Sequence, residues 1–354
     1  MRRTKIAATL LTVAFVGIPA LSALTARASH GQAGKGPLNN GQANSGQVSE
    51  GQANGGQDQE PHQMTGTLSV ETRLVDVFAT VRDKHNAIID NLTKDDFKVY
   101  EDGQPQKITY FAKESDLPIT LAILMDTSYS MNNILGAEKD AASEFVHEIM
   151  RKKDEAIVMS FDTDVDLLAD FTEDPAVLTK AIHRAEINVD ASGIGGTVGT
   201  IPSRGGGTNL YDAIYLACHD ELGSEAGRKA VIILSDAEDT GSKMSIDQAI
   251  ESAERGDAVI HVMLISDPGA SEGYGTGVAL QMARETGGRV IAVHNEKTLD
   301  KAFDEIGEEL RSQYVLGYTP SNVARDGTYR KLKVETVQPD TKVLTRKGYY
   351  APNH

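Results

Sequence analysis

The stretch ITLAILMDTSYSM, residues 119–131, decides the fold. It opens with a continuous, strongly apolar run, which is typical of a strand buried on both faces of a sheet. The run ends at Asp126, and two hydroxyl side chains follow on alternate residues, Ser128 and Ser130. Burying a carboxylate and hydroxyls without partners costs folding free energy, so this cluster needs hydrogen-bonding partners or a ligand.

Further apolar runs without alternation follow downstream. They are EAIVMSF (155–161), AVIILSD (230–236), DAVIHVMLIS (257–266) and GRVIAVH (288–294). Helical patterns separate most of these runs; the segment 245–256, for example, begins with a capping box of Ser245 and Gln248 and ends at Gly256. This alternation predicts an α/β fold, with a doubly wound, mostly parallel sheet that carries helices on both faces.

The segments on either side of this region have the other strand pattern. VDVFATV (75–81) places its Val and Ala side chains on one face, which is the period of a half-buried strand. Asp102-Gly103 and Asp326-Gly327 predict turns between short strands. Together the two flanks have enough strands for one small antiparallel β-sandwich, in which the α/β domain is inserted or by which it is flanked. Two small separate sheets are the alternative.

The N-terminal region has the layout of a secretory signal peptide. A basic start (MRRTK) precedes an apolar run over 6–24 and the small-residue sequence ARA at 26–28. The run is also just long enough to span a bilayer, so an uncleaved signal anchor is the alternative. Repeated Gly-Gln pairs over 31–63, almost without apolar side chains, predict a disordered linker. The predicted order is signal peptide 1–28, linker 29–63, β module 64–115, α/β domain 118–310 and β module 312–352.

Charge and cysteine content narrow the function further. The formal net charge of -16 argues against binding to a phosphate backbone, which requires a basic face. The single cysteine, Cys218, lies in a helical pattern and cannot form a disulfide within the chain. We interpret it as a core residue. The signal peptide predicts a secreted or periplasmic protein, with membrane attachment only if the signal segment remains uncleaved.

Three short pieces of sequence place oxygen ligands near strand ends. Asp126, Ser128 and Ser130 follow the first buried strand, Thr208 stands in GGGTNLYDA at the start of a helix, and Asp236 follows another buried strand. Ligands gather at the carboxyl ends of the strands in a parallel sheet. A set of oxygens without sulfur or imidazole selects a hard cation: Mg²⁺, or Mn²⁺ or Ca²⁺. Alternatively, the hydroxyls only cap helices.

In these residues the chain resembles the von Willebrand factor type A domain with its metal-ion-dependent adhesion site. The family pattern is Asp-x-Ser-x-Ser followed by a distant Thr and a distant Asp. The resemblance covers residues 118–310 and implies that the five residues named above hold a divalent cation. It also implies that the open coordination position takes a carboxylate from a partner protein. The chain is therefore expected to be a protein-binding or adhesion module, without catalytic residues.

The chain departs from the family pattern at two glycine positions. Tyr129 stands between the serines, where it can cover the site or contact a partner, and Ala237 follows the last aspartate. Alanine is compatible with the turn if its φ stays negative. The strand-rich flanks resemble those of a bacterial group of von Willebrand factor A-related proteins, frequent in acidobacteria.

Other functions fit the sequence less completely. Asp162, Asp164 and Asp166 imitate a calcium loop, but Leu167 occupies the position where the sharp turn requires glycine, and the following run fits a strand. The same stretch imitates an aspartyl-phosphate-type hydrolase with Asp162 as nucleophile, which leaves the serines and Thr208 unexplained. A third alternative is a structural envelope scaffold that is only stiffened by the metal.

Overall fold

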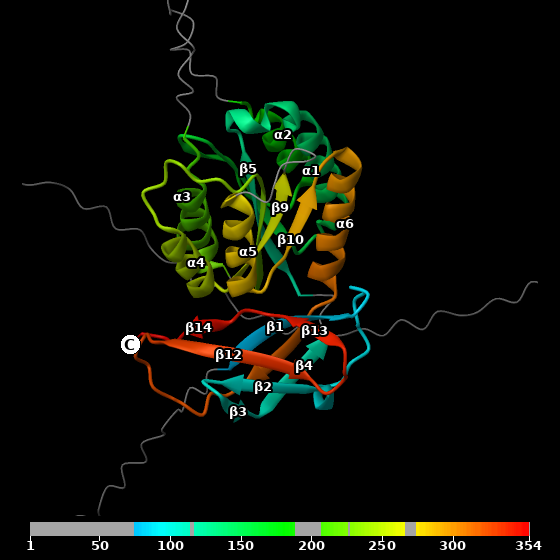
Figure 1. Cartoon of the computed structure of the whole chain (residues 1–354), viewed down its shortest axis with the longest axis vertical. Coiled ribbons are helices and arrows are strands. Elements are labelled where there is room, and N and C mark those ends of the chain that lie inside the picture. The colour runs from blue at the N-terminus through cyan, green and yellow to red at the C-terminus, as the bar shows by residue number, and fades with distance from the viewer. Residues whose placement is uncertain (1–73, 114–116, 188–206, 226, 266–273, 354) are drawn as a thin grey trace, which may run out of the picture. The chain divides into compact units, whose positions relative to one another are not determined.

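The computed structural model describes residues 74–113, 117–187, 207–225, 227–265 and 274–353. The predicted signal peptide and linker lie outside these residues. The described chain has the predicted fold class, an α/β domain with a mostly parallel sheet beside an antiparallel β module (Figure 1). None of the helices in these ranges has the length and hydropathy that a membrane span requires.

The central sheet has six strands in the order β10-β9-β8-β5-β6-β7. Their bounds are β5 Ile119–Asp126, β6 Glu155–Phe161, β7 Val165–Thr172, β8 Arg228–Ser235, β9 Ala258–Ile265 and β10 Val290–Val293. All neighbouring pairs are parallel except β6 and β7. Every residue of β5 is buried, as its continuous apolar sequence predicts, because helices cover both faces of the sheet.

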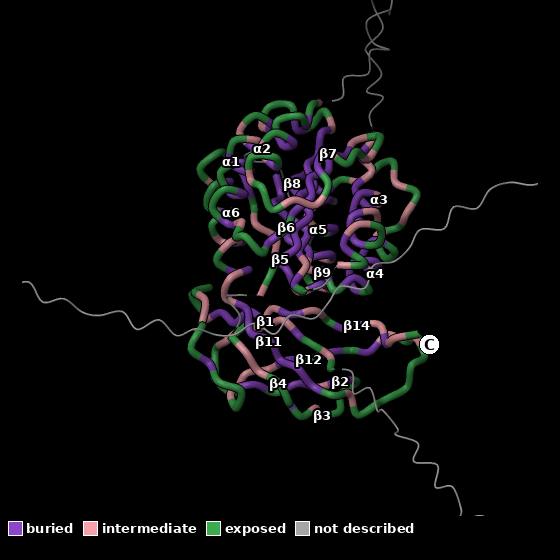
Figure 2. Tube along the Cα trace, turned by 180° about the vertical axis from the view of Figure 1, so that it is seen from behind, coloured by how far each residue is buried: buried purple, intermediate pink, exposed green. Residues whose placement is uncertain are grey.

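Helices form a layer on each face of this sheet. α1 (Leu135–Ile149), α2 (Pro175–Arg184) and α6 (Glu296–Arg311) enclose one hydrophobic core, and α3 (Leu210–Tyr215), α4 (Ile246–Arg255) and α5 (Tyr274–Thr286) enclose the other (Figures 1 and 2). A 3₁₀ segment, η2 (Tyr129–Asn133), precedes α1, and a π turn (Leu216–Glu221) and a 3₁₀ turn (Leu222–Ser224) follow α3. The predicted capping box opens α4.

The β module consists of two four-stranded antiparallel sheets, β13-β1-β11-β4 and β14-β12-β2-β3. Its elements are β1 Val75–Asp83, η1 Lys94–Asp96, β2 Phe97–Glu101, β3 Gln104–Gln106, β4 Ile108–Lys113, β11 Tyr314–Tyr318, β12 Tyr329–Thr336, β13 Thr341–Leu344 and β14 Gly348–Tyr350. Each sheet combines strands from both flanks, and one hydrophobic core joins them. The α/β domain is thus inserted between β4 and β11 of a sandwich.

The β module contacts the α/β domain at the ends of several helices. Tyr329 Oη donates a hydrogen bond to Glu254 at the end of α4, 2.9 Å away. The Lys347 backbone N–H donates to the carbonyl of Glu285 at the end of α5, also over 2.9 Å. In a parallel α/β fold the helices run antiparallel to the strands, so their C-terminal ends lie at the amino edge of the sheet. The carboxyl edge, where the candidate site lies, is therefore at the opposite end of the domain.

Candidate metal centre

Asp126 ends β5 and is fully buried at the carboxyl edge of the sheet. Met125 pairs with Leu234 in the parallel ladder, which brings Ser235 of β8 beside Asp126. Ser235 Oγ donates a hydrogen bond to Asp126 Oδ2 over 2.5 Å, and the Ser128 backbone N–H donates to Oδ1 over 2.9 Å. Both carboxylate oxygens are thereby fixed in orientation.

The two serines of the motif lie next to each other. The hydroxyl oxygens of Ser128 and Ser130 are 3.0 Å apart, a hydrogen-bonding distance between two groups that also favour cation binding. Ser128 is the N-cap of η2, yet its side chain makes no capping hydrogen bond. The alternative interpretation, in which this serine only caps the following helix, therefore lacks its expected contact.

Thr208 is held between two other loops at the same edge. Its backbone N–H donates to Thr240 Oγ1 over 3.0 Å, and its carbonyl accepts from the Thr240 N–H, also over 3.0 Å. The Asn209 N–H donates to the carbonyl of Asp162 over 2.7 Å. The N-cap of α3 is Asn209, so Thr208 precedes the helix instead of capping it. It is also buried, with 7% of its surface exposed.

Asp236 follows β8 immediately and is half-buried. Its Oδ1 accepts a hydrogen bond from the Glu238 backbone N–H over 3.1 Å, which closes a small turn. The first turn of α5 packs against its backbone, because a Cβ added at Gly275 would lie 2.0 Å from the Asp236 carbonyl oxygen. The absence of a side chain at Gly275 therefore permits the observed position of Asp236.

Electrostatics at this edge suit a cation. The pKa of Asp126 is raised to about 6, mainly because burial disfavours the carboxylate, and the charge of Asp236 adds to this shift. Hydrogen bonds from Ser128 and Ser235 act in the opposite direction. A divalent cation would stabilise both carboxylates. Among the described residues no three His, Cys, Asp or Glu side chains converge, so a cation here needs the hydroxyls as well.

The backbone conformation of Ala237 differs from the one expected for alanine in this turn. Its φ is +57°, in the left-handed region, whereas the sequence interpretation required a negative φ. Ala237 is fully buried, and its neighbour Asp236 must turn away from β8 at this point. The chain therefore keeps the conformation that favours glycine although its sequence has alanine there.

Ser235 and Thr240, which hold Asp126 and Thr208, were not among the predicted site residues. Ser235 has a recognisable signal, because it ends a buried strand one residue before a candidate ligand. The contact of Thr240 with Thr208 joins two loops far apart in sequence and has no local signal. Cys218 is buried, and burial raises its pKa to about 12, in agreement with a core role.

The residues that imitated a calcium loop form a β-hairpin turn. Asp162 Oδ2 accepts a hydrogen bond from Thr127 Oγ1 over 3.1 Å, and Oδ1 accepts from the Asp164 N–H over 3.1 Å. β7 begins at Val165, so a strand replaces the second helix that such a motif requires. Asp162 thus has a structural contact to the residue that follows Asp126.

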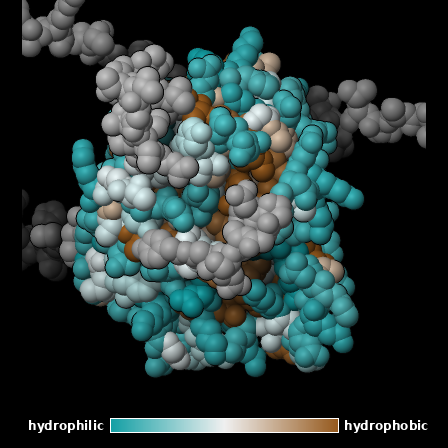
Figure 3. Space-filling view, turned by 45° about the horizontal axis from the view of Figure 1, so that its top comes forward, coloured by the Kyte–Doolittle hydropathy of each residue, from teal (hydrophilic) through white to brown (hydrophobic). Residues whose placement is uncertain are grey.

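The surface near the carboxyl edge includes an exposed aromatic ring. Tyr129, between the two serines, keeps 58% of its surface exposed. Figure 3 views the molecule with the top of Figure 1 brought forward, and its described surface is largely hydrophilic with some apolar side chains between. Tyr129 therefore presents an aromatic ring to solvent beside the two serines.

Comparisons with known proteins agree with this architecture. Residues 121–238, about a third of the chain, match the model of the von Willebrand factor type A domain family. No curated protein matches the chain.

Several solved structures are similar. Proximal thread matrix protein 1 from the mussel byssus is 14% identical with a TM-score of 0.46, over 60% of this chain and 51% of its own. This chain thus spans about half the length of the mussel protein. The von Willebrand factor domain of the type V pili tip protein Mfa5 from Porphyromonas gingivalis is 13% identical with a TM-score of 0.43, over 55% of this chain and 95% of its own.

A von Willebrand factor type A protein from Catenulispora acidiphila is 14% identical with a TM-score of 0.44, over 80% of this chain and 64% of its own. The family match covers β5, β6 and β8 together with Asp126, Ser128, Ser130, Thr208 and Asp236. The central part of this chain, residues 121–238, therefore matches the von Willebrand factor type A domain family.

Proposed function

We propose that the chain is a divalent-cation-dependent protein-binding module whose centre takes Mg²⁺, with Mn²⁺ or Ca²⁺ as alternatives. The observation that carries this proposal is the pair of serine hydroxyls, 3.0 Å apart, beside the buried carboxylate of Asp126. Hydroxyl and carboxylate oxygens are the ligands that these hard cations prefer. The strand register beside Asp126 and the loop contacts of Thr208 support the inclusion of the remaining members.

Each residue has a distinct part in this centre. Ser128, Ser130 and Thr208 supply neutral hydroxyl oxygens, while Asp126 and Asp236 supply the negative charge. The cation, when bound, supplies an electrophilic centre that attracts a carboxylate of a partner protein. Because neutral ligands leave much of the cation's charge uncompensated, an acidic side chain of the partner gains more here than in bulk water.

The proposed location is outside the cytoplasm, in the periplasm or secreted, reached through the predicted signal peptide 1–28. Membrane contact is proposed only through that segment if it is uncleaved, and nucleic acid is not a proposed ligand. The proposal does not include enzymatic activity. The hydrolase alternative loses support because Asp162, its candidate nucleophile, has oxygens that accept hydrogen bonds from Thr127 and Asp164 in the hairpin turn.

Calorimetry with MgCl₂ and MnCl₂ on the whole chain tests cation binding. We expect one cation per chain, with binding removed in Asp126→Ala and weakened in Thr208→Val, which keeps the shape of threonine but lacks its hydroxyl. Glu144→Ala is the control, since Glu144 is exposed on α1. Unchanged binding in Asp126→Ala would show that these residues do not form the site.

Partner binding is tested with the immobilised chain and envelope proteins of a bacterial source, in Mg²⁺ and in EDTA. We expect proteins that are retained in Mg²⁺ to be released by EDTA and not retained by Asp126→Ala. Retention that survives EDTA, while the metal is shown to be absent, would favour the alternative of a structural scaffold with a stabilising metal.

A further inference from the structure

Glu138 occupies an unusual position on α1. Leu135, Ala142, Phe145 and Ile149 form the stripe that packs against the central sheet, and Glu138 lies on the same face of the helix. Its side chain is fully buried. Neither of its carboxylate oxygens has a hydrogen-bond partner among the described residues. A glutamate therefore stands where the helix pattern calls for an apolar residue.

The other buried carboxylates in the described chain all have hydrogen-bond partners. The contacts are Glu101 with Tyr318, Tyr349 and Arg330, Asp126 with Ser128 and Ser235, Asp154 with Ile119 and Arg311, Glu254 with Tyr329, and Glu309 with Arg82. An unpaired buried carboxylate destabilises a fold, and its protonated form still has an O–H donor to satisfy. Glu138 consequently requires a compensating group of another kind.

Glu138 also lies near the candidate metal centre. It stands in the first turn of α1, the helix that follows Ser128 and Ser130. Backbone hydrogen bonds connect it to the motif: the Glu138 N–H donates to the Ile134 carbonyl, the Ile134 N–H to the Met131 carbonyl and the Met131 N–H to the Ser128 carbonyl, each over 3.0 Å. Burial and, to a smaller degree, the charge of Asp126 raise the pKa of Glu138. Two carboxylates that repel each other in a buried environment are the arrangement that a nearby cation stabilises.

We propose that Glu138 is a positioning residue of the cation centre, which supplies a further carboxylate behind Asp126 and strengthens the binding of a divalent cation there. This inference rests on the proposed function. The three hydroxyls are neutral, so the only charges in the predicted ligand set are those of Asp126 and Asp236. A third carboxylate, buried and screened from water, adds attraction for a divalent ion without occupying a coordination position. Glu138 thus destabilises the metal-free protein and favours the loaded one.

The test combines cation affinity with stability in the whole chain. For Glu138→Gln, which removes the charge at nearly constant shape, we expect the Kd for Mn²⁺ to rise about 10- to 100-fold, the range found when residues that support metal ligands are changed. For Glu138→Met, we expect the melting temperature in EDTA to rise above that of the wild type, and the increase caused by Mn²⁺ to be smaller.

Two further variants distinguish the effect of the charge of Glu138 on Mn²⁺ binding from the effect of its shape and from that of burying any glutamate. Glu138→Asp keeps the charge but shortens the side chain, so a charge role predicts that it binds Mn²⁺ more tightly than Glu138→Gln, and a purely steric role predicts the reverse order. Glu254→Gln removes another buried glutamate, which lies at the end of α4 near the β module. It should leave the Kd for Mn²⁺ unchanged.

The outcomes of these experiments distinguish a failure of the inference about Glu138 from a failure of the proposed cation-dependent function. If the wild type binds Mn²⁺ through Asp126 and Glu138→Gln binds it equally well, Glu138 is only a buried acid and the inference is wrong, while the proposed function stands. If the wild type does not bind Mn²⁺, or Asp126→Ala binds it as well as the wild type, the proposed metal centre itself is wrong and the inference falls with it.

Discussion

Arg82 on β1 and Glu309 on α6 form a buried ion pair, with 2.7 Å between Arg82 Nη2 and Glu309 Oε2. The pair joins the β module to the last helix of the α/β domain. Arg289 also approaches Glu309, with 3.5 Å between Nη1 and Oε2, and pairs more closely with Glu305 at 2.8 Å. One carboxylate at the end of α6 is therefore shared by cations from both parts of the fold.

Arg82→Ala should destabilise the protein strongly, because it leaves a buried carboxylate with a single, more distant cation. Removing one partner of a buried pair typically costs about 3–5 kcal/mol, and Arg289 should keep the loss near the lower end. Arg284→Ala is the control, since Arg284 pairs with Glu285 while 72% of its side chain is exposed. Its loss should stay below about 1 kcal/mol. Urea unfolding measures the free energy of unfolding of both variants, and equal losses of stability in the two would contradict the prediction.

Gly275→Ala and Gly277→Ala form a matched pair on α5. A Cβ at residue 275 would overlap the Asp236 carbonyl, whereas a Cβ at residue 277 meets nothing within 4 Å. Gly275→Ala should therefore cost about 1–3 kcal/mol and weaken Mn²⁺ binding by displacing Asp236. Gly277→Ala should add up to about 1 kcal/mol of stability, because alanine favours the helix, and leave binding intact. Thermal unfolding and calorimetry on both variants check this, and similar behaviour of the two would be incompatible with the packing described.

A fragment of residues 64–115 should not fold alone. β1 pairs with β11 and β13, β4 pairs with β11, and β2 has β12 as its neighbour opposite β3. The fragment therefore lacks one of the two central strands of each sheet, β11 in one and β12 in the other, and exposes unpaired edges. We expect an NMR spectrum with little amide dispersion, or aggregation. A well-dispersed spectrum would establish an independent domain.

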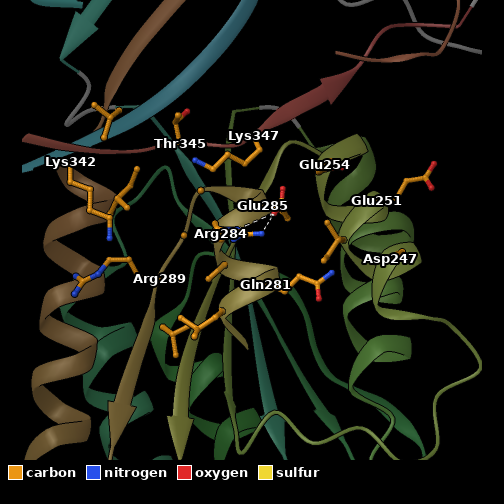
Figure 4. Close-up of a pocket in the computed structure, with 18 of the residues that line it drawn as sticks. Asp247, Glu251, Glu254, Gln281, Arg284, Glu285, Arg289, Lys342, Thr345 and Lys347 are labelled. Carbon is orange, nitrogen blue, oxygen red and sulfur yellow. Dashed lines mark hydrogen bonds and ion pairs between the residues drawn. The ribbon is translucent and has the colours of Figure 1, made fainter. Parts of the chain in front are cut away.

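Stability should depend on pH through Glu254. This residue lies beside a groove lined by charged side chains of the α/β domain and the β module (Figure 4). Burial raises its pKa from 4.5 to about 7, with contributions from the charges of Glu285 and Glu251, while a hydrogen bond from Tyr329 and the charge of Arg346 oppose the shift.

Because the folded state favours the protonated form of Glu254, it binds more protons than the unfolded state between these pH values. The stability that this group contributes is full below pH 4.5 and is lost as the pH rises through about 7. Glu254→Gln should flatten the fall in melting temperature between pH 5 and pH 8, measured in EDTA. A variant with the full slope of the wild type would assign the pH dependence to other groups.

The fold was predictable because its strongest signals are local. The apolar run that ends at Asp126 and the alternation of VDVFATV each identify a strand from a few residues. The capping box at Ser245 identifies a helix start in the same way. Such patterns depend on neighbouring residues, so tertiary structure has little opportunity to override them.

The details of the candidate site were less predictable because they depend on residues far apart in sequence. The φ of Ala237 follows from the packing around a buried turn, and propensity alone favoured a negative value. The loop contacts of Thr208 show that it is buried ahead of α3, although its sequence context resembles a helix cap. Glu138 had no local signal, because a polar residue in a helix is ordinarily placed towards solvent.

The insertion of the α/β domain between adjacent strands has a mechanical consequence. Lys113 at the end of β4 pairs with Tyr314 at the start of β11, so the chain leaves and re-enters the β module at one point. Tension between the segments before β1 and after β14 runs through the β module and bypasses the inserted domain. A pull on the carboxyl edge of the α/β domain would instead be carried in parallel by the two connections at β4–β5 and α6–β11 and by the contacts between the domain and the β module, such as the Arg82–Glu309 pair.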